Sequence, residues 1–209
     1  MQIRVRNAIA SFDHIRKPYV PKTGDAKFSI CGICDDKTTI RFTRDGENHE
    51  VHHTEFMEKV MPLLMEDADI KKKPVTFFNY LYNKASEQVG MRKPKISEKT
   101  GGYYEGYDED TMFFSAGTKA DDAPDGIMVV DEKLRPLDAS KGKPKAGDRV
   151  TILISAYCYS SKDNGTGASG GLEGVQFLAK GKGFGRVAPE PSAFDEEVED
   201  TTEEEEAPI

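Results

Sequence analysis

Alternating apolar and polar residues mark the beginning and the last third of the chain. In residues 2–11, Ile3 and Val5 fall on one face of an extended backbone. Arg4 and Arg6 fall on the other face. This period of two is typical of a half-buried β-strand. The same character predicts further strands at residues 27–34, 38–43, 111–117, 126–131, 148–161 and 172–180.

The strand predicted at 148–161 has the clearest pattern. Its expected core face carries Val150, Ile152, Ile154, Ala156 and Cys158. The opposite face carries Arg149, Thr151, Leu153, Ser155, Tyr157 and Tyr159. The glycine-rich residues 164–171 that follow predict a flexible turn, and order is expected to fade from Gly181 onward.

A helical period is confined to the middle of the chain. Apolar residues recur at intervals of three and four in residues 53–67 and again in residues 74–91. These two predicted helices form an insertion at about 54–91. Because strands and helices do not alternate one for one, the pattern favours a mainly β fold over a doubly wound sheet. We expect a small closed or partly open barrel of five to six strands.

The charge of the chain is unevenly distributed. Lys and Arg number 29 against 37 acidic residues, but ten of the acids lie in the last twenty residues. The rest of the chain therefore has a small positive charge, and an acidic composition does not exclude nucleic acid. Three cysteines without framework spacing indicate a reducing compartment. The sequence has no signal peptide and no apolar run of the roughly 18 residues that a membrane helix needs, so we expect a soluble protein.

Cysteine and histidine spacing raises one metal hypothesis. Cys31, Cys34, His49 and His53 match the ligand spacing of a zinc site with two cysteines and two histidines. The alternative is that residues 27–34 form a strand, in which residues three apart point to opposite faces and cannot share a metal. A zinc-binding interaction module therefore stays as an alternative function. No metal is assigned in the primary prediction.

Two further motifs are weak. Residues 182–187 resemble an RNA-binding signature, but Arg186 replaces its second stacking aromatic, so a flexible basic exit segment is favoured. The glycine-rich residues 164–171 lack the lysine and the following helix of a phosphate-binding loop. No nucleophile, paired carboxylates or cofactor fingerprint stands out. The sequence thus predicts neither an enzyme nor a cofactor.

Tyrosines interleaved with basic residues are the main functional signal. Flat rings stack on unpaired bases and cations neutralise phosphates, which is the chemistry of a groove for single-stranded nucleic acid. Any one tyrosine could instead pack inside the fold. The candidate binding residues are Arg4, Arg6, Lys93, Lys95, Tyr103, Tyr104, Tyr107, Arg149, Tyr157, Tyr159, Lys180, Lys182 and Arg186.

Several blocks of the sequence resemble a known family, the phage-encoded single-stranded DNA (ssDNA) binding proteins built on an OB-fold. These blocks are IRVRNAIASFDHIRKPYVP, GIMVVDEKLRPLDASKGKPKAGDRVTILISAYCYSS and NGTGASGGLEGVQFLAKGKGFG, followed by the acidic end. The resemblance implies an OB-fold domain at 1–186 and a disordered acidic tail at 187–209. It implies sequence-independent ssDNA binding in phage DNA replication, recombination and repair, in the cytoplasm of the infected bacterial host.

The resemblance also gives the tail a role. Glu203, Glu204, Glu205, Glu206 and Ile209 would compete with DNA for the basic groove and recruit replication proteins such as a polymerase or a primase-helicase. Ile209 stands where tails of this class end in an aromatic residue. A homodimer is compatible with this assignment. One rival stays open, a protein-only scaffold in which the acidic tail is the functional part.

Overall fold

The computed structural model describes residues 1–70, 77–90, 92–138, 140, 142, 144–161 and 165–184. Within these residues ten β-strands form one sheet, and the prediction of a mainly β fold is confirmed. The strands are β1 (Gln2–Tyr19), β2 (Lys27–Ile33), β3 (Thr39–Arg44), β4 (Glu47–His52), β5 (Phe77–Asn79), β6 (Tyr82–Lys84), β7 (Met112–Lys119), β8 (Met128–Val130), β9 (Arg149–Ser161) and β10 (Gly165–Ala179). Three of them, β4, β5 and β6, are in addition to the strands expected from the alternating pattern, and β8 lies within the strand predicted at 126–131.

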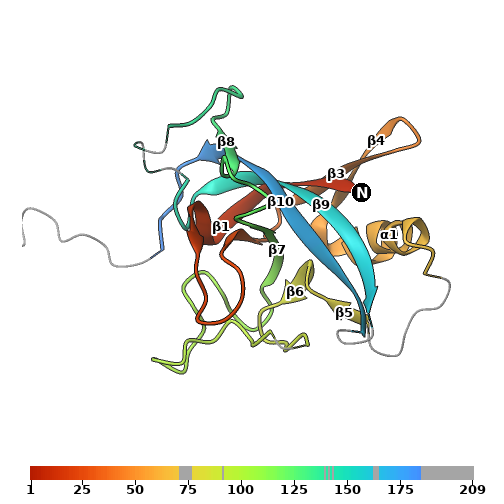
Figure 1. Cartoon of the computed structure of the whole chain (residues 1–209), viewed down its shortest axis with the longest axis horizontal. Helices are drawn as coiled ribbons and strands as arrows, with labels where there is room; N and C mark the ends of the chain where they lie inside the picture. Colours follow the sequence, from red (N-terminus) through yellow and green to blue (C-terminus); the bar gives the residue numbers. More distant parts are fainter. Residues whose placement is uncertain are drawn as a thin grey trace, which may run out of the picture.

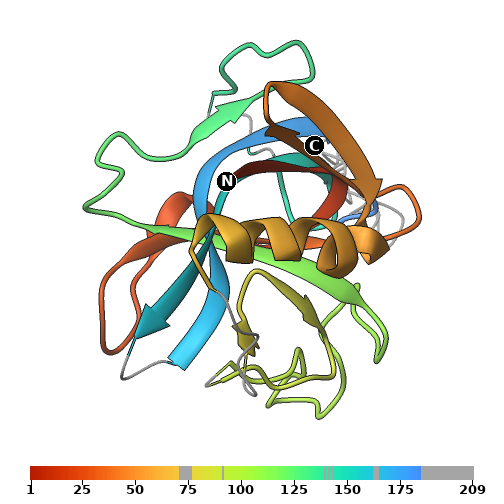
Figure 2. The same ribbon diagram turned by 90° about the vertical axis from the view of Figure 1, so that its right-hand side faces the viewer.

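The sheet curves around its own core without closing (Figures 1 and 2). Its strand order is β5-β10-β9-β1-β2-β7-β6, with β3 paired to β1, β4 paired to β3 and β8 parallel to β10. Among the described residues no backbone ladder joins β7 to β10, although Thr118 Oγ1 donates a hydrogen bond to Leu172 O at 2.8 Å. The arrangement is therefore a partly open barrel.

Strand β1 bends twice and pairs with different strands along its length. Its first half pairs with β3 and β9, and its second half pairs with β2. The bends coincide with Asn7 and Phe12, whose φ angles are 57° and 47°. The register shifts near both residues, as expected where an extra residue bulges from a ladder.

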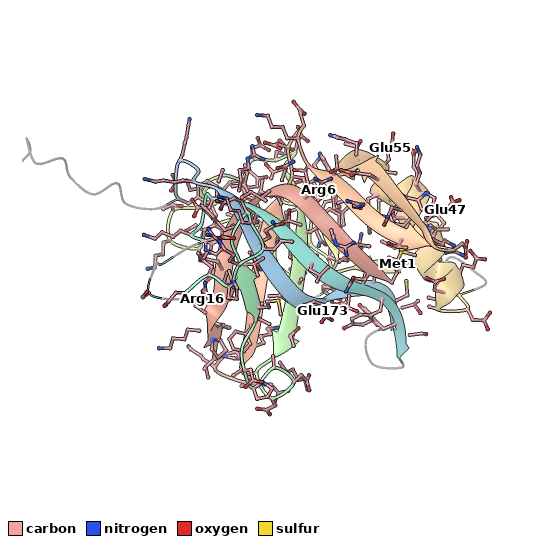
Figure 3. The ribbon with its side chains drawn as sticks, turned by 90° about the horizontal axis from the view of Figure 1, so that it is seen from above. Met1, Arg6, Arg16, Glu47, Glu55 and Glu173 are labelled. Carbon is pink, nitrogen blue, oxygen red and sulfur yellow. The ribbon has the colours of Figure 1, made fainter. Side chains whose placement is uncertain are left out.

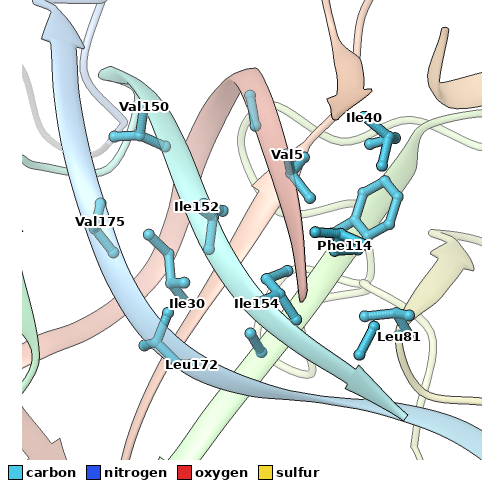
Figure 4. Packing of buried hydrophobic residues seen from close by; sticks show 14 of the residues in the cluster. Val5, Ile30, Ile40, Leu81, Phe114, Val150, Ile152, Ile154, Leu172 and Val175 are labelled. Atoms are coloured by element: carbon cyan, nitrogen blue, oxygen red, sulfur yellow. The ribbon is translucent and has the colours of Figure 1, made fainter. Parts of the chain in front are cut away.

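The core lies between the facing strands of the curved sheet (Figure 4). Val150, Ile152, Ile154 and Ala156 of β9 are all buried, which confirms the core face predicted for this strand. Their alternation works because successive side chains of a strand point to opposite faces. Burying these branched side chains is the main favourable term for the fold.

The helical insertion is confirmed in its first part. A 3-10 turn (His53–Glu55), a π-helical turn (Phe56–Val60) and the helix α1 (Met61–Asp67) follow one another along the chain. Phe56 and Val60 are completely buried beneath the sheet opening. This segment carries the apolar stripe that the spacing in residues 53–67 predicted.

The second predicted helix is wrong, because its residues form the short strands β5 and β6. The side-chain oxygen of Asn79 accepts hydrogen bonds from the backbone N–H groups of Leu81 and Tyr82, each at 3.0 Å, and this turns the chain. β6 then pairs with β7, and β5 pairs in parallel with β10. Aromatic residues suit such strands, so tertiary pairing overrides the apolar spacing that suggested a helix.

The glycine-rich segment was predicted to be a flexible turn, but Gly165–Gly171 forms the first part of strand β10. Gly170 explains why glycine is needed inside this strand. A Cβ atom at Gly170 would lie 2.6 Å from Ile154 Cγ2 and 2.9 Å from Leu81 Cδ1. Glycine here permits close approach of the backbone to the core.

Candidate nucleic-acid groove

Two neighbouring hollows open on one side of the barrel. The first, which we call the Arg92 hollow, has a volume of about 610 Å³ and lies against β1, β2, β7 and β10. Its aromatic and cationic lining residues include Phe12, His14, Lys27, Tyr80, Arg92, Lys95 and Lys119. The second, the Lys99 hollow, has a volume of about 590 Å³ and includes Lys93, Lys99 and Tyr104. Phe12 and Lys95 line both, so the two hollows adjoin, and we refer to them together as the groove.

Lys95 is held at the junction by aromatic rings. Its Nζ atom lies 4.4 Å from the centre of the Phe12 ring and 4.8 Å from that of Phe113. Backbone hydrogen bonds fix its place in the chain, because Lys95 N donates to Ala85 O at 2.8 Å and Tyr104 N donates to Lys95 O at 3.0 Å. No carboxylate of a described residue forms an ion pair with this ammonium group. The charge is stabilised by ring faces and remains available to an anion.

Arg92 is the second unneutralised cation of the groove. Its Nη1 atom donates to Tyr80 O at 3.1 Å, and its Cζ atom lies 5.3 Å from the centre of the Tyr80 ring. Burial lowers the pKa of this guanidinium, although it stays charged at neutral pH. No ion pair joins it to a carboxylate within the described part of the chain. A half-buried cation that no described carboxylate neutralises favours binding of an anion.

Tyr80 connects this cation to an aromatic pair. The rings of Tyr80 and Tyr159 are nearly parallel, with their centres 6.3 Å apart and a 23° angle between their planes. Tyr159 is not among the residues that line the groove, but its ring packs against that of Tyr80. Tyr157, two residues earlier on the same face of β9, is 49% exposed and pairs with Ser169, which lines the Arg92 hollow. The aromatic surface thus extends from the groove onto β9.

The predicted tyrosine loop divides into exposed and buried rings. Tyr104 is 39% exposed and lines the Lys99 hollow, so it is available for stacking. Tyr103 is half-buried and packs beside the cluster around Phe113. Tyr107 is 8% exposed, and its ring meets that of Phe113 edge to face at 5.6 Å. The assignment of Tyr107 to base stacking is wrong, because its ring is part of the core that supports the groove.

Three predicted arginines lie away from the groove. Arg149 is held by Asp35 in a two-point ion pair and also donates from Nη1 to Asn7 O at 2.6 Å, so its charge is neutralised within the fold. Arg6 contacts both carboxylate oxygens of Glu50 at 2.8 Å. Arg4 lies opposite Arg41 on the neighbouring strand β3. Figure 3 shows Arg6 on the part of β1 that neighbours the β3–β4 hairpin.

The remaining predicted cations occupy different settings. Lys93 forms an exposed ion pair with Glu98 at 2.7 Å. Lys180 and Lys182 are exposed at the end of β10 and in the segment that follows it.

The expectation that order fades from Gly181 is wrong for residues 181–184. Gly181 N donates to Asp148 Oδ1 at 3.0 Å, and the Phe184 ring packs beside Tyr103 against the Phe113 cluster.

Part of the site prediction lies outside the described residues. This applies to Arg186 and to the tail residues Glu203, Glu204, Glu205, Glu206 and Ile209. Phe184 is the last described residue and lies beside Gly106, in the loop that also carries Tyr104 and Tyr107. The described part of the chain therefore ends beside the loop that carries Tyr104.

The zinc hypothesis does not fit the geometry. Cys31 and Cys34 belong to separate core clusters on opposite sides of the sheet, as the strand interpretation requires. His53 Nδ1 lies 2.9 Å from the hydroxyl of buried Tyr82, and the His49 ring stacks on Phe42. The described residues contain no group of three or more His, Cys, Asp or Glu side chains that could hold a metal ion. The four residues are used in packing.

Sequence reasoning missed Phe12, Tyr80 and Lys119 as groove residues and left Arg92 out of the assigned set. The signal for Arg92 was present, since it stands in the basic run before the tyrosine loop. Phe12 and Tyr80 had no local signal, because only the pairing of distant strands brings them together.

In the part of the chain that the structure describes, no helix has the length and apolar character to cross a membrane.

The family model described as "Enterobacter phage Enc34, ssDNA-binding protein" matches residues 1–207. Protein p50 of Acyrthosiphon pisum secondary endosymbiont phage 1 is 35% identical over 81 residues, which are 39% of this chain and span only 40% of that protein.

Two solved structures share the fold. The ssDNA-binding protein from bacteriophage Enc34 in complex with ssDNA has a TM-score of 0.57 at 17% identity, covering 88% of this chain and 89% of that chain. A second structure of that protein has a TM-score of 0.55 at 16% identity, covering 93% and 90%. At these identities the likeness concerns the architecture alone.

Proposed function

Because the chain belongs to the family of the Enterobacter phage Enc34 ssDNA-binding protein, we propose that it binds ssDNA along the groove formed by the Arg92 and Lys99 hollows. One observation carries this proposal: Arg92 and Lys95 line a groove walled by aromatic rings, and no described carboxylate pairs with either cation. The resemblance to phage ssDNA-binding proteins is confirmed by the family match. That membership also confirms the prediction of a non-enzymatic protein.

The groove offers the two kinds of contact that a single strand needs. Phosphates would meet the Arg92 guanidinium and the Lys95 ammonium, and counterion release would favour binding at low salt. Bases would stack on Tyr80 and Tyr104, each contributing on the order of 1–3 kcal/mol. A base must be unpaired to expose its face to a ring, so this chemistry favours single strands over duplexes. Ring faces accept all four bases, which supports binding without sequence specificity.

The biological setting is proposed on the same basis. Coating of exposed single strands would serve phage DNA replication, recombination and repair in the cytoplasm of the infected host cell. In this proposal, residues 1–186 form the DNA-binding domain and residues 187–209 form an acidic tail. The domain can act as a monomer or as a homodimer, which sedimentation of the free protein would distinguish.

The acidic tail would regulate the groove. Ten acidic residues lie in the last twenty positions, and Phe184, the last described residue, lies beside Gly106 in the tyrosine loop. A tethered polyanion has a high effective concentration near the groove, so it would compete with DNA. Once DNA displaces it, Glu203–Glu206 and Ile209 would be free to bind replication proteins such as a polymerase or a primase-helicase.

A fluorescence titration tests the proposal. Intrinsic tyrosine emission is followed while oligo(dT) is added to the full chain at several salt concentrations, with a duplex of equal length as the comparison. We expect quenching, preference for the single strand, and affinity that falls linearly with log salt. Absence of retention of the single strand even at low salt would contradict the proposed function and would favour a protein-only role.

A further inference from the structure

The ring of Phe12 stands at the junction of the groove. Phe12 and Lys95 are the two residues shared by the linings of the Arg92 and Lys99 hollows. The Phe12 side chain is half-buried, so part of its surface borders each hollow. A polynucleotide that occupies both hollows must therefore pass this ring.

The backbone holds Phe12 in an uncommon conformation. Its φ angle is 47°, in the left-handed region that bulky side chains rarely adopt. The residue lies where the β1–β2 register shifts between Ser11 and His14. Bulges of this kind redirect a side chain out of the regular alternation of a strand. Phe12 is thus turned out of the regular strand pattern and into the groove lining.

Surrounding side chains fix the ring. The Tyr104 ring meets it edge to face, with centres 4.9 Å apart and planes at 89°. The Tyr107 ring lies 6.0 Å away, and the Lys95 ammonium lies over one face at 4.4 Å. Such contacts limit the rotamers of Phe12, so its position is set before any ligand binds.

We propose that Phe12 is a wedge that separates two base-binding subsites, so that consecutive bases on its two sides are unstacked from each other. Lys95, held on the ring, binds the phosphate that joins these two nucleotides. The inference rests on the proposed function, because it assigns a role to a residue within the same groove. Apolar side chains that enter a base step are known to unstack it at a free-energy cost.

The wedge gives the protein a preference for weakly stacking strands. Thymine runs stack weakly, whereas adenine runs must lose stacking when a ring enters between two bases. The protein is expected to bind oligo(dT) about fivefold or more tightly than oligo(dA) of equal length. This preference comes from deformability and requires no contact with base edges.

The experiment compares three full-length proteins: the natural chain, Phe12→Gly and Phe12→Leu. Glycine tolerates the left-handed backbone and removes the wedge, whereas leucine keeps an apolar side chain that can still separate two bases. Affinities for oligo(dT) and oligo(dA) are measured together with the fluorescence of a 2-aminopurine placed within an oligo(dA). Circular dichroism verifies that each variant is folded.

The natural chain should show the oligo(dT) preference and a rise in 2-aminopurine fluorescence on binding, because the probe loses a stacking neighbour. Phe12→Gly should bring the affinity ratio close to one and abolish the rise, and Phe12→Leu should keep both. A natural chain that binds both oligomers equally, or a folded Phe12→Gly that retains the preference, overturns the wedge while leaving ssDNA binding intact. Failure of the natural chain to bind either oligomer overturns the proposed function itself. The natural-chain measurement decides the question even if Phe12→Gly does not fold.

Discussion

Arg92 Nη1 donates a hydrogen bond to Tyr80 O at 3.1 Å, and the guanidinium carbon of Arg92 lies 5.3 Å from the centre of the Tyr80 ring. The contact connects the loop before the tyrosines with the turn that links β5 to β6. A cation and a ring from separate segments are thereby fixed together in one wall of the groove. The proposed binding mode uses both, the cation for a phosphate and the ring for a base.

Replacing Lys95 by methionine should weaken binding and flatten its salt dependence. Methionine keeps an apolar stem against Phe12 and Phe113 but removes the charge. We expect about a fivefold loss at low salt, with the slope of log affinity against log salt reduced by about 0.7, as for one lost phosphate contact on a single strand.

The comparison for this change is Lys93→Met. Lys93 also lines the Lys99 hollow, but its ammonium is exposed and already paired with Glu98, so its loss should cost less than that of Lys95. A larger effect at Lys93 than at Lys95 would place the phosphate contact on the outer side of the loop.

Replacing Tyr80 by leucine should lower the affinity for oligo(dT) by about tenfold, consistent with about 1–3 kcal/mol for one stacking ring. The comparison is Tyr157→Leu, which removes a ring that is 49% exposed on β9 but does not line the groove. Equilibrium titration of both variants separates two locations for the strand. If Tyr157→Leu loses binding and Tyr80→Leu does not, the strand follows the open face of β9 instead.

The Asp35–Arg149 ion pair should stabilise the fold and not the complex. Replacing Arg149 by glutamine leaves Asp35 and the Asn7 carbonyl without their donors, and we expect a loss of about 1–3 kcal/mol in the free energy of unfolding. Affinity for ssDNA should be unchanged under conditions where the variant is folded. Urea unfolding together with a DNA titration makes this distinction. A folded variant with weakened DNA binding would indicate that Arg149 contacts DNA.

The same pair predicts the direction of a pH effect. Hydrogen bonds from Arg149 hold the pKa of the Asp35 carboxyl below its usual value. A lowered pKa in the folded state means that the stabilisation is complete above the unfolded pKa of about 3.9 and is lost as the pH falls through the folded value. The difference in stability between the natural chain and Arg149→Gln should therefore shrink below about pH 4. A difference that persists unchanged at lower pH would exclude this ion pair as its source.

Removing residues 190–209 should tighten ssDNA binding at low salt. The natural chain carries ten acids in this segment, and their competition with DNA should fade as salt screens the charges. The control is the full-length chain with Glu203–Glu206 changed to glutamine. It removes four negative charges and keeps the length of the tail, so it separates the effect of charge from that of length. Equal or weaker affinity of the truncated protein at low salt would count against competition by the tail.

The β-strands were predictable where one face is buried and the other is not. In β9 the alternation from Val150 to Ala156 predicts which side chains face the core, because each inward position must be apolar. The helix predicted in residues 77–89 was wrong because apolar and aromatic residues at helical spacing also fit two short strands. The decisive influence there is the side chain of Asn79, which accepts two backbone donors and turns the chain. Spacing alone does not carry that information.

The groove was predictable in its chemistry and only partly in its members. Basic residues beside tyrosines indicated the kind of ligand, and Lys95 and Tyr104 do line a hollow. Arg149 looked free in the sequence because its partner Asp35 lies 114 positions away. Phe12 gave no sign of its position, since a bulge in β1 places it there. Long-range pairing thus decided which candidates line the groove.

Photochemical cross-linking tests the location of the bound strand most directly. An oligonucleotide with 5-iodouracil at successive positions is irradiated on the full-length protein, and the adducts are located by mass spectrometry. If the strand lies in the proposed groove, the adducts will fall in the segments that carry Phe12, Tyr80 and Tyr104. Adducts confined to the outer face around Arg4 and Arg41 would contradict that location.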